Sequence, residues 1–167
     1  MPIMLTHGFH EELMRQILKE KNVVHQHGYY LEDLSIGMTS SFEKTITDKD
    51  IQAFAAITGD TNPVHLDDEY AATTPFKARI AHGMMSAGLI STVLGTQLPG
   101  PGCIYLDQQI KFRAPVFIQD TVVATVTVED INQRRGRVTL KTQCFVKDKL
   151  VADGTASMMV DKKGSQN

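Results

Sequence analysis

Residues 84–98 read MMSAGLISTVLGTQL, and large apolar side chains occupy most sides of the helix that this stretch would form. A helix that is hydrophobic nearly all round is typical of a buried position in a protein core. Small residues, Ser or Gly, interrupt the apolar pattern, so another group can approach the backbone closely. The Pro-Gly-Pro-Gly run at 99–102 ends the helix. We therefore predict one long central helix around which the rest of the chain is built.

Four segments after this helix alternate between apolar and polar residues, as half-buried strands do. They span about residues 104–112, 122–128, 138–146 and 150–160. A further strand is predicted at 39–46, before the helix. Long strands with short connections favour an antiparallel meander. One buried helix and one antiparallel sheet predict an α+β fold in which the sheet must curl round the helix to cover it.

A short helix is predicted between the first strand and the central helix. Thr47-Asp48-Lys49-Asp50 matches a capping box, because an acid follows the Thr by three residues. The apolar pattern after it ends at Gly59, a residue suited to stopping a helix. A second short helix is expected from Asp67 to about Thr73.

Two side chains that can move protons follow this helix stop. Asp60 and His65 lie in the stretch Gly59-Asp60-Thr61-Asn62-Pro63-Val64-His65, and a carboxylate and an imidazole can hold one water molecule between them. Gly83 comes later, where the central helix begins, and its backbone N–H can stabilise an anionic oxygen. Those are the parts needed to add water across a double bond next to a carbonyl.

Each of these residues also has a plain structural interpretation. Asp60 could form an Asx turn, His65 a structural hydrogen bond, and Gly83 a simple turn. Asn62 is expected to shape the turn, and Ser91 is either a small packing residue or a supporting group near the substrate. A second set of residues has packing or a solvated strand face as the default reading, with substrate contact as the alternative: His82, Met84, Lys111 and Arg113.

The composition excludes several classes of protein. The chain has 167 residues and a net charge of −2, which gives no general electrostatic case for binding nucleic acid or an anionic membrane. The two cysteines, Cys103 and Cys144, have neither metal-site spacing nor the number that a disulfide framework requires. We expect a reducing compartment, the cytoplasm, with an organelle left open. No metal or cofactor is predicted, because no cluster offers three ligands at suitable spacing.

The chain divides into three parts by pattern. Residues 1–28 are expected to be a helical extension, with an amphipathic helix over 8–21. Residues 29–160 form the single domain, and the polar residues 161–167 are expected to be a disordered tail.

Two motifs resemble the hydratase-2 motif of MaoC-like hot-dog proteins. They are Gly59–Asp67 (GDTNPVHLD) and Ala81–Met84 (AHGM). The similarity covers about residues 35–160, and residues 1–28 have no counterpart in the minimal family pattern. It also includes Leu98-Pro99-Gly100, Ile104-Tyr105-Leu106 and Phe112-Arg113-Ala114-Pro115-Val116.

The resemblance implies a hot-dog fold, a homodimer or larger oligomer, and an acyl-thioester tunnel near the protomer interface. It implies reversible hydration of trans-2-enoyl-CoA to (R)-3-hydroxyacyl-CoA, without a cofactor. The catalytic pair of the family falls on Asp60 and His65, its backbone oxyanion donor on Gly83, and an assisting serine on Ser91.

Three alternatives remain open from the sequence. The first is the same chemistry on an acyl-carrier-protein thioester, although only Arg134-Arg135 offers a basic patch for that protein's acidic surface. The second is a hot-dog thioesterase, which would release free thiol. The third is a non-catalytic acyl-CoA-binding module, and such a module has no need of a water-activating pair.

Overall fold

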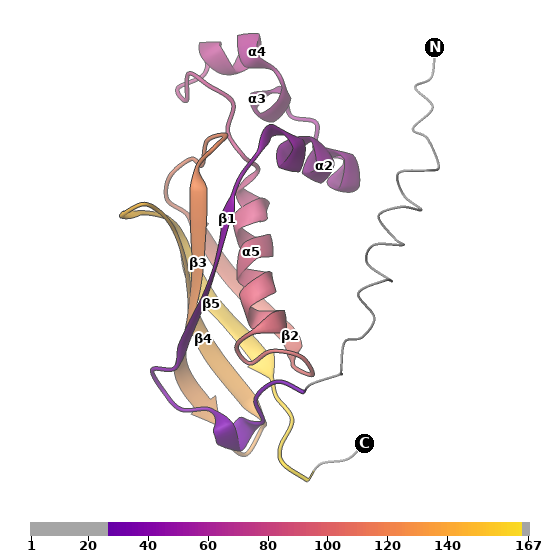
Figure 1. The fold of residues 1–167 in the computed structure, drawn as a ribbon, viewed down its shortest axis with the longest axis vertical. Helices are drawn as coiled ribbons and strands as arrows, with labels where there is room; N and C mark the ends of the chain where they lie inside the picture. The colour runs from indigo at the N-terminus through magenta and orange to yellow at the C-terminus, as the bar shows by residue number, and fades with distance from the viewer. Residues whose placement is uncertain (1–26, 165–167) are drawn as a thin grey trace.

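A five-stranded antiparallel sheet lies against one long helix in the computed structural model, which describes residues 27–164 (Figure 1). The predicted helix over 8–21, with the rest of residues 1–26, lies outside the described residues. No helix of the described part is long and apolar enough to cross a membrane. The elements are η1 Leu31–Asp33, β1 Thr39–Thr45, α2 Asp48–Thr58, α3 Pro63–Leu66, α4 Asp68–Thr73, α5 Gly83–Thr96, β2 Ile104–Phe112, β3 Thr121–Asn132, β4 Arg137–Val146 and β5 Lys149–Met159.

The strand order in the sheet is β1-β3-β4-β5-β2. The predicted meander is correct for β3, β4 and β5, which are consecutive neighbours, but it is wrong for β2. Strand β2 pairs with β5, from Ile104 opposite Met159 to Phe112 opposite Ala152, and not with β3. Residues 113–120 allow this, because they form no tight hairpin and carry the chain from β2 at one edge of the sheet to β3, which lies next to the opposite edge strand.

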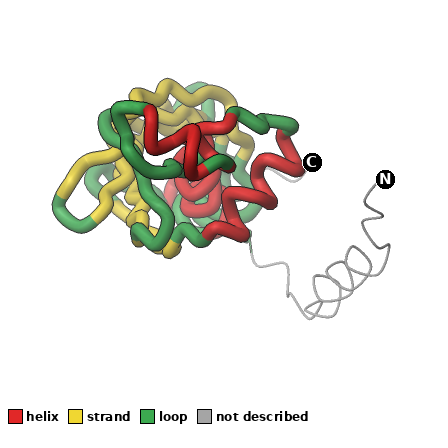
Figure 2. Tube along the Cα trace, turned by 90° about the horizontal axis from the view of Figure 1, so that it is seen from above, coloured by secondary structure: helices red, strands yellow, loops and turns green. Residues whose placement is uncertain are grey.

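Helix α5 and the inner face of the sheet form the core. This arrangement of a sheet curled round a central helix is the hot-dog fold that the resemblance implied. Figure 2 shows the helices gathered on one side of the sheet. The buried residues that α5 contributes are Leu89, Ile90, Val93 and Leu94, and those from the strands include Val122, Val126, Val128, Val138, Leu140, Val151 and Met158.

One side of α5 remains exposed. Met84, Gly88, Ser91 and Gly95 lie on it at spacings of three and four residues, which places them in one stripe along the helix. The prediction of a helix buried nearly all round is therefore wrong for this stripe, because the sheet of one chain covers only the opposite side.

Helices α2, α3 and α4 gather at the end of the sheet where α5 begins (Figure 1). Helix α2 starts with the predicted capping box, in which Thr47 and Asp50 bond reciprocally, and stops at Gly59 in the left-handed conformation (φ 77°). Helix α4 confirms the predicted second short helix. Helix α3 was not predicted. It begins with Pro63 after the capping residue Asn62, and it carries His65.

Residues 161–164, which belong to the stretch expected to be disordered, contact the start of the domain. The carbonyl of Asp161 accepts a 2.8 Å hydrogen bond from the backbone N–H of Leu31. Lys163 forms an ion pair with Asp33.

Candidate active site

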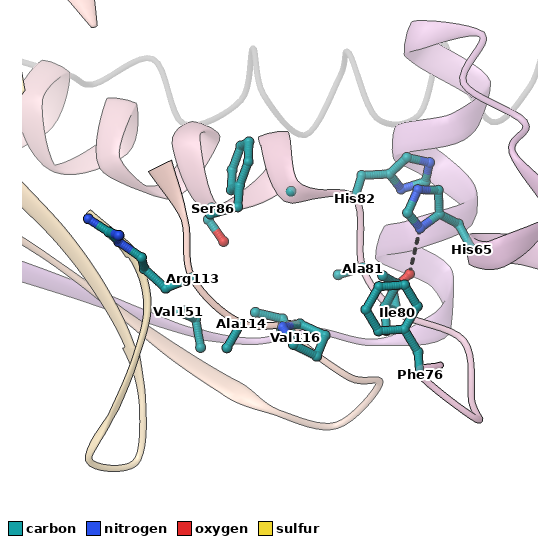
Figure 3. A pocket seen from close by; sticks show the side chains of 13 residues that line it. His65, Phe76, Ile80, Ala81, His82, Ser86, Arg113, Ala114, Val116 and Val151 are labelled. Atoms are coloured by element: carbon teal, nitrogen blue, oxygen red, sulfur yellow. Dashed lines mark hydrogen bonds between the residues drawn. The ribbon is translucent and has the colours of Figure 1, made fainter. Parts of the chain in front are cut away.

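A cavity of about 360 Å³ opens at the N-terminal end of α5 (Figure 3). It lies between the loop that precedes α5 and the segment that follows β2. Most of the side chains around it are apolar, as is usual for a small-molecule site. The lining residues are His65, Phe76, Ile80, Ala81, His82, Gly83, Ser86, Phe112, Arg113, Ala114, Pro115, Val116 and Val151.

The structure brings the carboxylate of Asp60 next to the imidazole of His65. Asp60 follows the end of α2, and its Oδ1 accepts a 3.2 Å bond from the backbone N–H of Asn62. His65 is only 8% exposed, and its Nδ1 donates a 2.8 Å hydrogen bond to the carbonyl of Ile80. When this imidazole is neutral, Nε2 therefore keeps its lone pair free to bind a proton. Ligand atoms of Asp60, His65 and His82 all lie within 4.8 Å of one another.

His82 holds this pair together. Its ring is 2% exposed and packs between His65, at a centroid distance of 3.9 Å, and Phe54, at 4.8 Å. Its Nε2 donates a 3.0 Å bond to the backbone carbonyl of Asp60. Its Nδ1 is buried and has no hydrogen-bond partner among residues 27–164. Although His82 occupies the N-cap of α5, its side chain makes no capping bond.

The same three residues offer donors that a metal ion could use. The sequence spacing predicted no cluster of three possible metal ligands, but the fold brings these three side chains close together. The rings of His65 and His82 are tilted by 31° with their centroids 3.9 Å apart, and each ring already uses one nitrogen on a backbone carbonyl.

Gly83 is the first residue of α5, where backbone N–H groups have no partner within the helix. Partial positive charge from the helix dipole gathers at the same place. A Cβ atom added at Gly83 would lie 3.0 Å from the ring of Phe112, so the two residues are in tight contact. Glycine therefore keeps both the Phe112 ring and a ligand close to this backbone.

The other predicted residues are placed in different surroundings. Asn62 accepts a 3.3 Å bond from the backbone N–H of Val64 and so caps α3. Met84 and Ser91 lie on the exposed stripe of α5 and do not line the cavity. Lys111 is exposed and lines a separate surface depression.

Arg113 lines the cavity and pairs with Asp153 through a 2.6 Å bond. The side-chain hydrogen bond from Arg113 is the main reason why the pKa of Asp153 lies below its usual value. The guanidinium is half exposed at the cavity mouth, where it can also meet an anionic group of a ligand.

Ser86 is the cavity residue that the sequence reasoning missed. In the sequence, Ser86 is only one of the small residues that interrupt the apolar helix. The available signal was its position three residues after Gly83, which places the two on one face of a helix.

Comparison with known proteins decides the family. A model of the MaoC like domain matches residues 34–149, which is more than half of the chain. The chain belongs to the MaoC-like family. Within it, this MaoC-like protein is 53% identical over 136 residues to the (R)-specific enoyl-CoA hydratase of Rhodospirillum rubrum, covering 81% of this chain and 94% of that one.

Two further relatives of the MaoC-like protein have related names. The 3-hydroxybutyryl-CoA dehydratase of Methylorubrum extorquens is 51% identical over 134 residues, which cover 80% of this chain and 85% of the relative. The unliganded R-hydratase structure from Pseudomonas aeruginosa matches with a TM-score of 0.77 and 42% identity, covering 81% of this chain and 88% of that one.

Proposed function

We propose that this MaoC-like protein is a hydro-lyase that reversibly adds water to trans-2-enoyl-CoA and forms (R)-3-hydroxyacyl-CoA. One observation carries the proposal: the ligand atoms of Asp60 and His65 lie within 4.8 Å of one another, and His65 lines the same mostly apolar cavity as Gly83, the first residue of α5. The names of the Rhodospirillum rubrum and Methylorubrum extorquens relatives support it.

The proposed mechanism uses one water molecule held between Asp60 and His65. Hydrogen bonds of about 2.8 Å on each side can bridge a gap of the size seen here, where the ligand atoms lie within 4.8 Å of one another. As the pair takes a proton from water, the water oxygen bonds to C3 of the enoyl group. A proton is returned to C2 on the same face. Acid–base help of this kind contributes roughly 10²–10⁴-fold in rate.

Gly83 has the complementary role in this proposal. Negative charge gathers on the thioester oxygen while the C3–O bond forms, and the backbone N–H of Gly83 stabilises it. These steps need only the residues of the chain and water, so the proposed reaction uses no cofactor and no metal. We also propose a reducing compartment such as the cytoplasm, which the free thiols of Cys103 and Cys144 support.

We further propose that the protein is a homodimer joined along β2. This strand is a sheet edge, and it exposes Ile104, Leu106 and Phe112. A long apolar edge is a ready template for pairing with another strand, and a two-fold axis would pair β2 with its own copy. Because Phe112 also lines the cavity, such pairing would place the site near the protomer interface.

Loss of the enoyl-thioester absorbance of crotonyl-CoA tests the function. With the wild type, the absorbance should decrease as the double bond is hydrated, and the product should have the R configuration. Asp60→Asn and His65→Ala should each lose at least 10²-fold in rate. Asp148→Asn, which removes an exposed carboxylate in the turn between β4 and β5, is the matched control and should keep wild-type activity.

Other outcomes identify the alternatives. Release of free CoA without change at the double bond would indicate a thioesterase. Turnover only with an acyl-carrier-protein thioester would indicate a carrier-protein dehydratase. Binding of acyl-CoA with no turnover of either thioester would leave a binding module and would reject the proposed function.

A further inference from the structure

We propose that the hydroxyl of Ser86 is a second hydrogen-bond donor to the thioester oxygen, alongside the backbone N–H of Gly83. This inference rests on the proposed hydratase function and adds a side chain to its oxyanion site. It comes from the structure alone, because neither the sequence motifs nor the resemblance pointed to Ser86.

Ser86 is a buried residue whose hydroxyl opens into the cavity. The residue is 6% exposed and lines the cavity, and Figure 3 shows its oxygen directed into the open space. No protein hydrogen bond to Oγ occurs within the described residues. The cavity lining includes apolar side chains such as Val116 and Val151, which cannot supply a partner. A ligand oxygen in the cavity would satisfy the hydroxyl.

The two threonines of α5 bond within the helix, whereas the exposed Ser91, like Ser86, makes no side-chain hydrogen bond among the described residues. Thr92 Oγ1 donates to the carbonyl of Gly88 at 3.1 Å, and Thr96 Oγ1 donates to the carbonyl of Thr92 at 2.7 Å. Such a bond to the carbonyl four residues back is the ordinary solution for a hydroxyl inside a helix. Ser86 does not use it and keeps its donor available to the cavity.

Helix geometry directs Ser86 towards Gly83. Residues three apart share one face of a helix, and each Cα–Cβ bond tilts towards the N-terminus. The side chain of Ser86 therefore lies over the first turn of α5, whose free N–H belongs to Gly83. One ligand oxygen in front of this turn can accept from both donors.

Two donors suit the charge that the reaction develops. When the water oxygen bonds to C3, the electron pair of the double bond moves towards the thioester oxygen, giving an enolate. Protonation at C2 then restores the carbonyl. Ser86 and Gly83 would hold the oxygen throughout, and their bonds would be strongest while it carries the charge.

Turnover of crotonyl-CoA by Ser86→Ala and Ser86→Cys tests this role. Removing one such donor should lower kcat on the order of 10²-fold, with KM changed little, because the bond strengthens in the transition state. Cysteine has nearly the same size as serine but is a weak hydrogen-bond donor, so the kcat of Ser86→Cys should fall as much as that of Ser86→Ala. If the hydroxyl only fills space, Ser86→Cys keeps wild-type kcat, and the proposal is overturned.

Thr96→Ala is the matched control, because it deletes a hydroxyl at the other end of α5, about 15 Å along the helix from Ser86. It should keep wild-type kcat. Failure of the inference and failure of the proposed function are distinguishable. A wild type that hydrates crotonyl-CoA while both Ser86 variants match it overturns only the role of Ser86. A wild type without turnover rejects the function, and the inference falls with it.

A binding measurement without turnover gives a second readout. The enolate of acetoacetyl-CoA resembles the charged intermediate and has its own absorbance. The wild type should favour the enolate of the bound compound, and Ser86→Ala should bind it with a smaller enolate fraction. Equal enolate fractions in both proteins would overturn the proposal even if Ser86→Ala were slow.

Discussion

The Nε2 atom of His82 donates a 3.0 Å hydrogen bond to the backbone carbonyl of Asp60, 22 positions earlier in the chain. The same ring stacks on His65. A single buried side chain thus contacts both members of the proposed water-binding pair. Asp60 and His65 make no hydrogen bond to each other within residues 27–164, and His82 contacts both of them.

His82→Phe should keep the stacking but lose the bond to Asp60. We expect the free energy of unfolding to fall by about 1–3 kcal/mol, since a carbonyl loses its partner. We also expect kcat/KM for crotonyl-CoA to fall, since the Asp60 loop is no longer held. Urea denaturation and initial rates measure the two effects. A folded variant with wild-type kcat/KM would show that the bond does not position Asp60.

Gly83→Ala should fold and yet impair the reaction. The added Cβ would lie 3.0–3.1 Å from ring atoms of Phe112, so this half-exposed ring must shift. The backbone N–H remains, but the approach to it is narrowed, and a loss of about tenfold in kcat/KM corresponds to ~1.4 kcal/mol. Steady-state kinetics test this. Adding Phe112→Ala should relieve the crowding, and a double variant no better than Gly83→Ala would argue against the contact as the cause.

Thr47→Ala should destabilise the domain by about 1 kcal/mol, the usual value of an N-cap residue. The comparison is between the urea midpoints of the wild type and the variant. Because Thr47 does not line the cavity, kcat should not change. A midpoint equal to that of the wild type would mean that the capping box adds no stability.

Acid should remove the stability that Asp50, the other residue of this capping box, contributes to the fold. Burial raises the pKa of Asp50, but hydrogen bonds from Thr47 and the ammonium of Lys44 outweigh it and hold the pKa below its usual 3.8. Because the pKa of Asp50 is lower in the folded state than in the unfolded state, its ionised carboxylate adds to stability at pH values above the unfolded-state pKa. That added stability is lost as the pH falls through the folded-state pKa. The stability difference between wild type and Asp50→Asn should therefore shrink from pH 7 to about pH 3. A constant difference would contradict the assignment.

The two thiols should differ in reactivity. Burial raises the pKa of Cys144 to about 12, and its side chain is fully buried, so it stays a protonated thiol inside the core. Cys103 is only partly buried. A thiol reagent should label Cys103 in the native protein and Cys144 only after unfolding. Mass spectrometry of partly labelled protein shows which of the two cysteines reacts first. Equal labelling of both would show that the core around Cys144 opens readily.

Leu106→Lys should convert the proposed dimer to monomers, because it places a charge on the apolar edge of β2. Glu43→Lys is the control, since it changes an exposed residue on β1 at the opposite edge of the sheet. Light scattering after gel filtration gives the mass of each. A monomeric wild type, or a Leu106→Lys variant that stays dimeric, would reject pairing through β2.

Local sequence patterns were enough for most individual elements. The capping box at Thr47, the stop at Gly59 and the alternating strands follow from interactions between residues close in the chain. The four-residue helix α3 was missed because its apolar pattern is too short to show a helical period. The position of β2 beside β5 was missed because strand neighbours depend on how a connection crosses the sheet, which no local pattern encodes.

The sequence by itself determined which groups are available for the chemistry: a carboxylate at 60, an imidazole at 65, and a glycine at the start of an apolar helix. Their types and short spacing are local properties, and so is the helix dipole. Only the tertiary structure decided that His82 sits between Phe54 and His65, and that the Ser86 hydroxyl is directed into the cavity without a partner. The physical reason is that burial and stacking arise from contacts between segments distant in the chain.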